Sequence, residues 1–114
     1  MTRDDVLKAA QKAVTEEREK QYGKPEKNFA KIAEYWTDYL RHAHGIYTDI
    51  TMMDVAHMMI LLKIARIHGK GTDDTYTDIA GYAALAAELV KYDEIMPDSE
   101  DGNVKTDVYK DMIV

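Results

Sequence analysis

The chain has 114 residues, no cysteine, and a formal net charge of −6 from 21 acidic and 15 basic side chains. This length predicts one domain, and the lack of cysteine excludes disulfides, zinc–thiolate sites and thiol nucleophiles. An acidic surface repels a phosphate backbone, so we expect no nucleic acid polymer as a partner. The N-terminus does not resemble a signal peptide, and the longest apolar run, 55–67, is too short to span a bilayer. We therefore expect a soluble, cytoplasmic protein with no membrane partner.

Helical periodicity begins at about Arg3 and continues to Gln21. The apolar face of this first helix consists of Val6, Ala10, Ala13 and Val14, and Glu17 continues the same stripe. The stretch "YGKP" (22–25) then ends the helix, because Gly23 favours a left-handed cap and Pro25 suits the first position of the next helix.

The second predicted helix runs from about Pro25 to Ala43 and has the clearest amphipathic pattern in the chain. Apolar residues recur at spacings of three and four, at Phe29, Ile32, Ala33, Trp36, Leu40 and Ala43. The dipeptide "HG" at 44–45 ends the pattern.

The third predicted helix starts near Thr51, where Thr51-x-x-Asp54 resembles a capping box, and ends at "HGKG" (68–71). It is apolar nearly all round, which predicts a helix surrounded by others. A fourth helix begins within "GTDDT" (71–75) and extends to about residue 96. We therefore predict an all-α fold, a four-helix bundle over residues 1–96, followed by a polar loop and short C-terminal segment at 97–114.

Polar residues interrupt the third helix at positions with two interpretations. Asp54 is either the cap of this helix or the acidic end of a cleft. Lys63 and Arg66 are either helix-end charges or the basic end of the same cleft. An acidic end facing a basic end is the arrangement that a magnesium-bound polyphosphate needs.

Two carboxylates at the start of the fourth helix, Asp74 and Asp78, lie one turn apart and extend the inward stripe that includes Tyr82. Asp74 also suits a helix N-terminus, where capping and the helix dipole favour acids. Two hard oxygen ligands one turn apart suit magnesium, or manganese, with waters and phosphate oxygens completing the site. This pair therefore predicts a metal site at the edge of the core.

Three blocks, "REKQYGKPEKNFAKIAEYW" (18–36), "DVAHMMILLKIAR" (54–66) and "DTYTDIAGYAALAAEL" (74–89), resemble a family of small phage and prophage proteins. That family is similar to the MazG-like, all-α NTP pyrophosphatases. Those enzymes bind magnesium through Glu-x-x-Glu and Glu-x-x-Asp patterns on adjacent helices. The second acidic pair of this chain is one residue wider and lacks glutamate.

The resemblance implies a four-helix fold of MazG-like type with a magnesium cofactor, Mn²⁺ being the substitute. The metal ligands would be Glu19, Asp54, Asp74 and Asp78. Asp54 and Asp78 would be the catalytic acids, one of which activates water. The candidate nucleotide-binding residues are Lys63 and Arg66 for phosphate, and Tyr22, Asn28, Trp36 and Tyr82 for base or sugar. For Trp36, core packing is an alternative.

The leading functional hypothesis is a phage-type, magnesium-dependent pyrophosphohydrolase that converts an NTP into a monophosphate and pyrophosphate. An alternative is a non-catalytic sponge that sequesters a host immune signalling nucleotide in the host cytoplasm. A second alternative is a structural helical oligomer without a ligand. Three or four carboxylates around one point favour chemistry, whereas one or two beside a basic pocket favour capture.

Self-association is expected on two grounds. A four-helix chain of this size, with tyrosine and methionine spread over several faces, leaves apolar surface to cover. The resemblance implies the same, because MazG-like enzymes form dimers or tetramers. We therefore expect a homodimer or homotetramer.

Overall fold

The computed structural model describes the backbone of residues 1–95 and the side chains of residues 1–92. Within that range the protein is all-helical without a β-strand, apart from an isolated bridge between His68 and Lys70. The helices occur in the order α1 (Arg3–Lys12), η1 (Ala13–Glu17), α2 (Arg18–Tyr22), α3 (Pro25–His44), α4 (Met52–Ala65) and α5 (Asp73–Ile95). The prediction for 97–114 lies outside the described residues. None of the described helices is long and apolar enough to cross a membrane.

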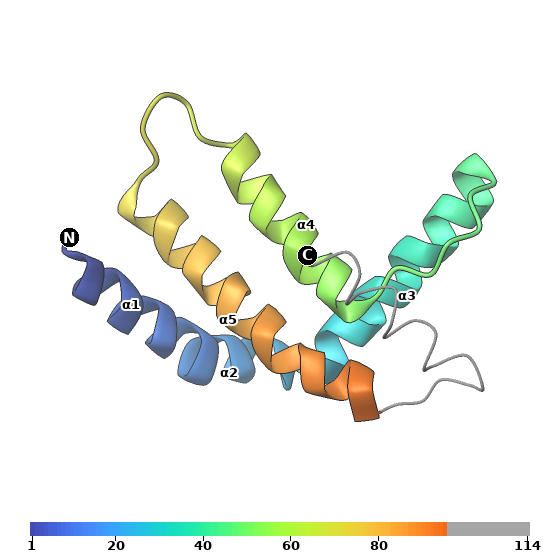
Figure 1. Cartoon of the computed structure of the whole chain (residues 1–114), viewed down its shortest axis with the longest axis horizontal. Coiled ribbons are helices and arrows are strands. Elements are labelled where there is room, and N and C mark those ends of the chain that lie inside the picture. Colours follow the sequence, from blue (N-terminus) through green and yellow to red (C-terminus); the bar gives the residue numbers. More distant parts are fainter. Residues whose placement is uncertain (96–114) are drawn as a thin grey trace.

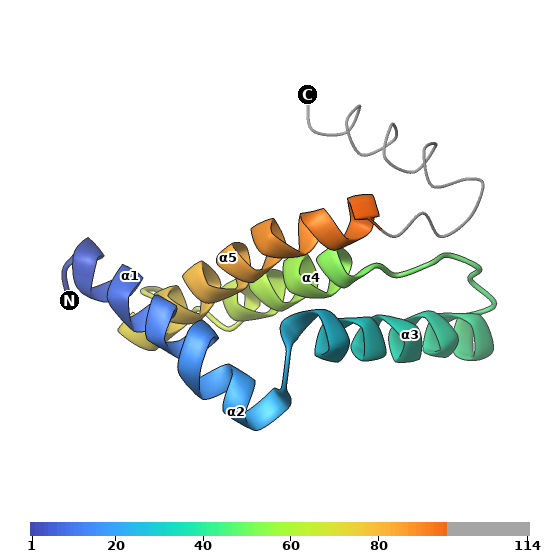
Figure 2. The ribbon, with the colours of Figure 1, turned by 90° about the horizontal axis from the view of Figure 1, so that it is seen from below.

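Helix α5 lies at the centre of the molecule. Helix α1 and the turn η1 pack along one side of α5, and α4 packs antiparallel along the other (Figure 1). Helix α3 crosses near the far end of α5 and then projects away from it (Figures 1 and 2). The predicted four helical segments are confirmed, but they form an open arrangement in which the C-terminal end of α3 projects away from its neighbours.

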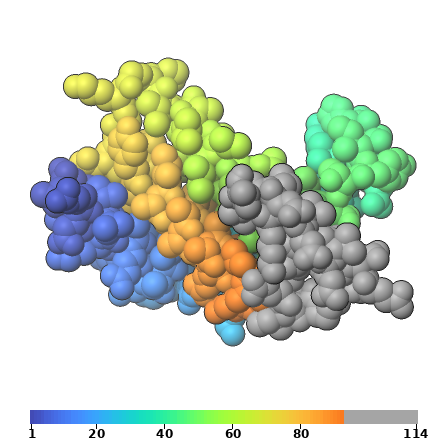
Figure 3. Space-filling view, viewed as in Figure 1, coloured from blue at the N-terminus to red at the C-terminus, as the bar shows by residue number. Residues whose placement is uncertain are grey.

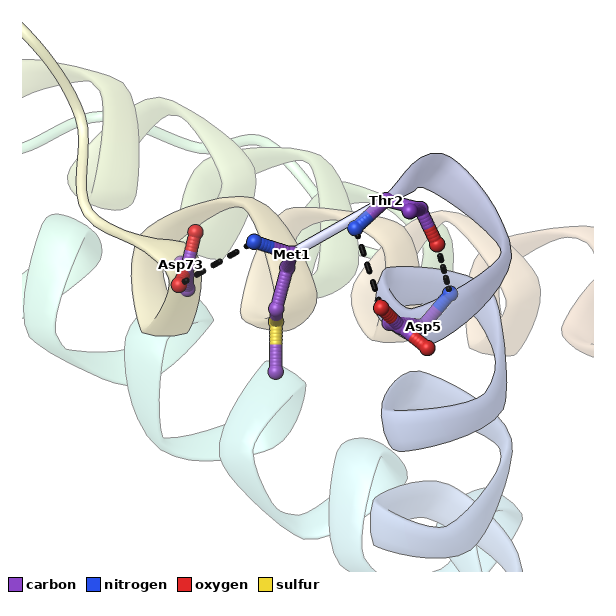
Figure 4. A network of polar contacts seen from close by, with 4 residues as sticks. All are labelled: Met1, Thr2, Asp5 and Asp73. Carbon is purple, nitrogen blue, oxygen red and sulfur yellow. Dashed lines mark hydrogen bonds and ion pairs between the residues drawn. The ribbon is translucent and has the colours of Figure 1, made fainter.

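The start of α1 is fixed by a capping box (Figure 4). The Asp5 backbone N–H donates to Thr2 Oγ1 over 3.1 Å, and the Thr2 N–H donates to Asp5 Oδ2 over 3.0 Å. The hydrogen bond from the Thr2 backbone lowers the pKa of Asp5 most, and the hydrogen bond from the Thr2 side chain lowers it further. The Met1 ammonium lies 4.0 Å from Asp73, so the chain start also contacts the start of α5.

The first helical segment contains a π-helical turn, η1, between α1 and α2. The Arg18 N–H donates to the carbonyl of Ala13, five residues earlier, which places one extra residue in the turn. The expected continuation of the apolar stripe at Glu17 is therefore wrong, because the extra residue rotates the helix by one position. Glu17 is exposed and Arg18 takes the inward position.

Glycines define both ends of α3. Gly23 separates α2 from α3 with φ 76° and ψ −161°, a conformation that favours glycine. Gly45 ends α3 in the left-handed region, where its N–H donates to Arg41 and the next N–H donates to Leu40. These boundaries agree with those predicted from "YGKP" and "HG".

The core is small and lies where α3, α4 and α5 meet. It consists of Phe29, Ala33, Val55, Ala56, Leu85, Ala86 and Leu89. Among the described side chains, Phe29, Val55 and Leu89 are the large ones that are fully buried. Trp36 packs against this cluster, so its core interpretation holds. The expectation that α4 is surrounded is wrong, because Met58, Leu61, Leu62 and Ile64 are exposed.

The π-helical turn η1 and helix α5 approach closely at Gly81. A Cβ atom built on Gly81 would lie 3.1 Å from Cγ1 of Val14, which is tighter than ordinary van der Waals contact. Gly81→Val should therefore force the helices apart and cost about 1–3 kcal/mol of unfolding free energy, although it removes a helical glycine.

Thermal or urea unfolding would measure this cost, with Ala84→Val at an exposed position of α5 as the control. Surface substitutions of that kind change stability by about 0.5 kcal/mol or less. Equal stability of the two variants would contradict the close approach of η1 to α5.

Candidate functional site

A pocket of about 120 Å³ lies between the π-helical turn and α5. Its walls mix apolar and polar side chains: Ala13, Val14, Arg18, Thr77, Asp78, Gly81, Tyr82 and Leu85. The space is large enough for a phosphate group or part of a ring, but too small for a whole nucleotide or drug-sized ligand, whose sites occupy about 300–1,000 Å³. A larger ligand would therefore extend out of the pocket onto the surrounding surface.

Arg18 is held on the pocket wall by aromatic rings. Its guanidinium carbon lies 5.0 Å from the ring centroid of Phe29, 5.1 Å from that of Tyr22 and 5.4 Å from that of Tyr82. Rings at these distances attract a cation through their electron-rich faces. The three rings come from α2, α3 and α5, so the position of Arg18 depends on the packing of three helices.

The hydrogen-bonding capacity of Arg18 is only partly used. Nη2 donates to Asn28 Oδ1 over 3.3 Å, whereas Nε is buried without a hydrogen-bond partner. None of the ion pairs formed by the described residues involves Arg18. A guanidinium carries five donors and normally faces a carboxylate or phosphate when it is partly buried. Arg18 therefore lacks an anionic partner within this part of the chain.

Asp78, on the opposite wall, is paired with a lysine. Its Oδ2 atom lies 2.9 Å from Nζ of Lys63, and its side chain is 43% exposed. The predicted inward position of Asp78 holds in part, because its side chain is half exposed, and the ammonium of Lys63 balances its charge. Arg18 lines the same pocket without forming an ion pair with another described residue.

Asp54 has the capping role and lies away from the pocket. Its Oδ2 accepts from the Thr51 N–H over 2.9 Å, and its own N–H donates to Thr51 Oγ1 over 3.0 Å. Lys63 follows nine residues later, which is about 13 Å along the helix at 1.5 Å per residue. Because α4 and α5 are antiparallel, Asp54 and Asp78 lie at opposite ends of the helix pair. The expected convergence of these two acids is not found within one chain.

The two remaining predicted metal ligands, Glu19 and Asp74, are exposed on α2 and on the first turn of α5. In the described part of the chain, no three side chains among histidine, aspartate and glutamate are grouped so that they could hold a metal ion. Hard divalent cations need several oxygen ligands at one point. The residues of a single chain therefore do not fit the magnesium site that the resemblance implies.

The predicted nucleotide-binding residues divide into two groups. Tyr22, Asn28 and Tyr82 all contact Arg18, and Tyr82 also lines the pocket. Arg66 is exposed as the C-terminal cap of α4. Three of the predicted nucleotide-binding side chains, two from the block 18–36 and one from the block 74–89, therefore gather around one arginine.

Arg18 itself is absent from the predicted site, because it sits in the charged run "EEREK", which resembles a solvated surface. The signal that identifies it is its spacing of four residues from both Val14 and Tyr22. That spacing fits one shared face, but Glu17, three residues after Val14, fits it as well, and the π-helical turn decides in favour of Arg18.

Comparison with known proteins matches residues 5–90 to a phage-associated family described as a domain of unknown function, DUF6378. The chain belongs to this family. Over 110 residues it is 36% identical to the Gene 55 protein of Mycobacterium phage D29, covering 96% of this chain and 68% of that protein. It is 40% identical over 85 residues to the Gene 55 protein of Mycobacterium phage L5, covering 74% of this chain and 51% of that protein. No solved structure matches the chain.

The family assignment agrees with the expected phage relationship. The further relationship to MazG-like pyrophosphatases, with its implied magnesium cofactor, remains a prediction. The matched residues 5–90 contain every side chain of the Arg18 site, from Ala13 to Leu85. The site therefore lies within the family's domain.

The cap formed by Asp54 predicts a purely structural effect of its removal. Thr51→Ala removes the N-cap and should lower the unfolding free energy by about 1 kcal/mol. Asp54→Ala, which removes the reciprocal hydrogen bond from N3, should also lower it. The double variant should cost less than the sum, because the two hydrogen bonds are reciprocal.

Thermal unfolding would measure these differences without added metal. Asp38→Ala, at an exposed position of α3, is the control and should not destabilise the protein. Unchanged stability of Asp54→Ala would contradict the capping role and return Asp54 to the list of candidate ligands.

Proposed function

We propose that the protein binds a nucleotide at the Arg18 pocket and retains it without cleavage. The observation that carries the proposal is a partly buried arginine, fixed by three rings and Asn28, that lacks an anionic partner among the described residues. A phosphate group is the anion that matches the planar fork of a guanidinium. Phage proteins of this kind would use such a site to sequester a host signalling nucleotide.

Two cations are available to a phosphate at this site. Arg18 lines the pocket directly, and Lys63 is paired with Asp78, which also lines it. The protein as a whole carries a charge of −6, so local positive charge is needed to hold an anion. A phosphate oxygen near Lys63 would compete with Asp78 for the ammonium. Because binding of an anion here would depend on attraction between opposite charges, which salt screens, the affinity should fall as salt concentration rises.

The rings around Arg18 suit the remainder of a nucleotide. Tyr22 is half exposed beside the guanidinium, so its ring surface continues from the pocket to the outside. A base can stack on such a ring, and the tyrosine hydroxyl can donate or accept a hydrogen bond. Since the pocket is too small for a whole nucleotide, the phosphate would occupy it and the base would lie against Tyr22.

Retention is favoured over hydrolysis by the number of carboxylates. Asp78 is the carboxylate that lines the pocket, and Lys63 already neutralises it. Metal-assisted cleavage of a triphosphate needs acids that hold an ion and an acid that activates water. Among the described residues, no three acidic or histidine side chains are grouped so that they could hold a metal ion, and the Asp54 carboxylate accepts from the Thr51 N–H instead.

Calorimetric titration with nucleoside triphosphates, cyclic nucleotides and ADP-ribose would test the proposal. Arg18→Gln should weaken binding of the active ligand by roughly tenfold or more, because hydrogen bonds to charged groups contribute about 1.5–3 kcal/mol. Arg3→Gln, at an exposed arginine of α1, is the matched control and should bind normally.

The ligand should be recovered intact after heating of the complex, both with and without magnesium. Pyrophosphate release that requires magnesium would overturn retention and restore the hydrolase hypothesis. Failure of all three ligand classes to bind the folded wild-type protein would overturn nucleotide binding itself.

A further inference from the structure

The outward face of α4 is apolar and uncovered. Its large side chains, Met58, Leu61, Leu62 and Ile64, are between 37% and 62% exposed. At 3.6 residues per turn, positions 54, 57, 58, 61, 62, 64 and 65 of this helix fall on one side, with Leu61 near the centre. Lys63 and the buried Ala56 lie on the opposite side, against α5. The outward face is therefore separate from the Arg18 pocket.

A second uncovered region is the C-terminal half of α3 with the segment that follows it. Tyr35, Tyr39 and Tyr47 are 60%, 62% and 77% exposed. Figure 3 shows the end of α3 standing apart from α4, with open space between them. A helix that does not pack on its neighbours is only marginally stable in water. We call the α4 face and these three tyrosines together the α3–α4 surface.

We infer that a second copy of this chain covers the α3–α4 surface, in a twofold-symmetric dimer centred on α4. The partner on this surface must stay bound, because the core of one chain contains only three fully buried large side chains among those described. A core that small gives marginal stability to a chain of this length. A second copy is the partner present whenever the protein is made, and obligate dimers often lack a stable folded monomer.

The charges on this surface also suit a second copy. Two chains that each carry −6 repel one another, so they must meet where charges are few. Among the outward positions of α4, Asp54 and His57 are the ionisable residues, both toward its N-terminal end, and the others are apolar. A twofold interface places the same patch on both sides, so each apolar row would face its equivalent.

The α3–α4 surface is large enough for a standard protein interface when its three tyrosines are included. A standard interface buries about 800 Å² on each partner. The exposed parts of the three tyrosines supply roughly 400 Å², at the 150–250 Å² typical of a buried aromatic side chain. The four α4 side chains supply apolar area at the centre, and Tyr with Arg is the composition that interfaces favour. Arg41 lies 5.3 Å from the Tyr47 ring within this region.

Sedimentation across a dilution series would test the inference. The wild type should be dimeric, and Leu61→Glu should weaken self-association by roughly tenfold or more, because it places a charge at the centre of the interface. Leu7→Glu is the matched control, since Leu7 is 63% exposed on α1, outside this surface, and Leu61 is 62% exposed. Tyr39→Ala should weaken the dimer less than Leu61→Glu does.

Cross-linking gives a second measurement that does not depend on a disruptive variant. Because the chain has no cysteine, Leu61→Cys and Leu7→Cys each introduce a single thiol. A short bis-maleimide should join two copies of Leu61→Cys and not two copies of Leu7→Cys. A folded, monomeric wild type, or a Leu61→Glu variant as dimeric as Leu7→Glu, would overturn the inference. Nucleotide binding is not involved in either readout, so this outcome is independent of the proposed function.

Discussion

The packing of Phe29 supports both the core and the candidate site. Its ring is fully buried where α3 meets α4 and α5, and the guanidinium of Arg18 lies 5.0 Å from its centroid. Loss of a buried phenylalanine costs about 3–5 kcal/mol, so this residue contributes a large share of the free energy that a small core can supply. The cation on the pocket wall is therefore placed by the same contact that anchors α3. Fold and site are coupled through one aromatic ring.

Local physical chemistry explains why the helices could be predicted from the sequence. Gly23, Pro25 and Gly45 have backbone preferences that act within a few residues, and these set the ends of α2 and α3 as predicted. Thr51 and Asp54 form the expected capping box for the same reason. Interactions that span three or four residues are present in the sequence itself.

The candidate site required information that helical periodicity does not contain. The convergence of Asp54 with Asp78 depended on how α4 and α5 run relative to one another, and their antiparallel packing separates the two acids. The inward position of Arg18 depended on the extra residue in the π-helical turn, which no periodic pattern specifies. By contrast, Tyr22, Asn28 and Tyr82 are predicted nucleotide-binding residues that do lie together, around Arg18, which the sequence did not indicate.

The backbone conformation at Gly23 affects the Arg18 site, because it sets the angle between α2 and α3. Of the rings around the guanidinium, Tyr22 precedes this glycine and Phe29 follows it, so the angle between α2 and α3 sets how well they enclose the cation. A ligand that prefers the enclosed arginine would hold this angle closed, and a contact that opened the angle would release the ligand. Because such coupling is reciprocal, a ligand in the pocket would favour one direction of α3, and a change in that direction would alter the affinity for the ligand.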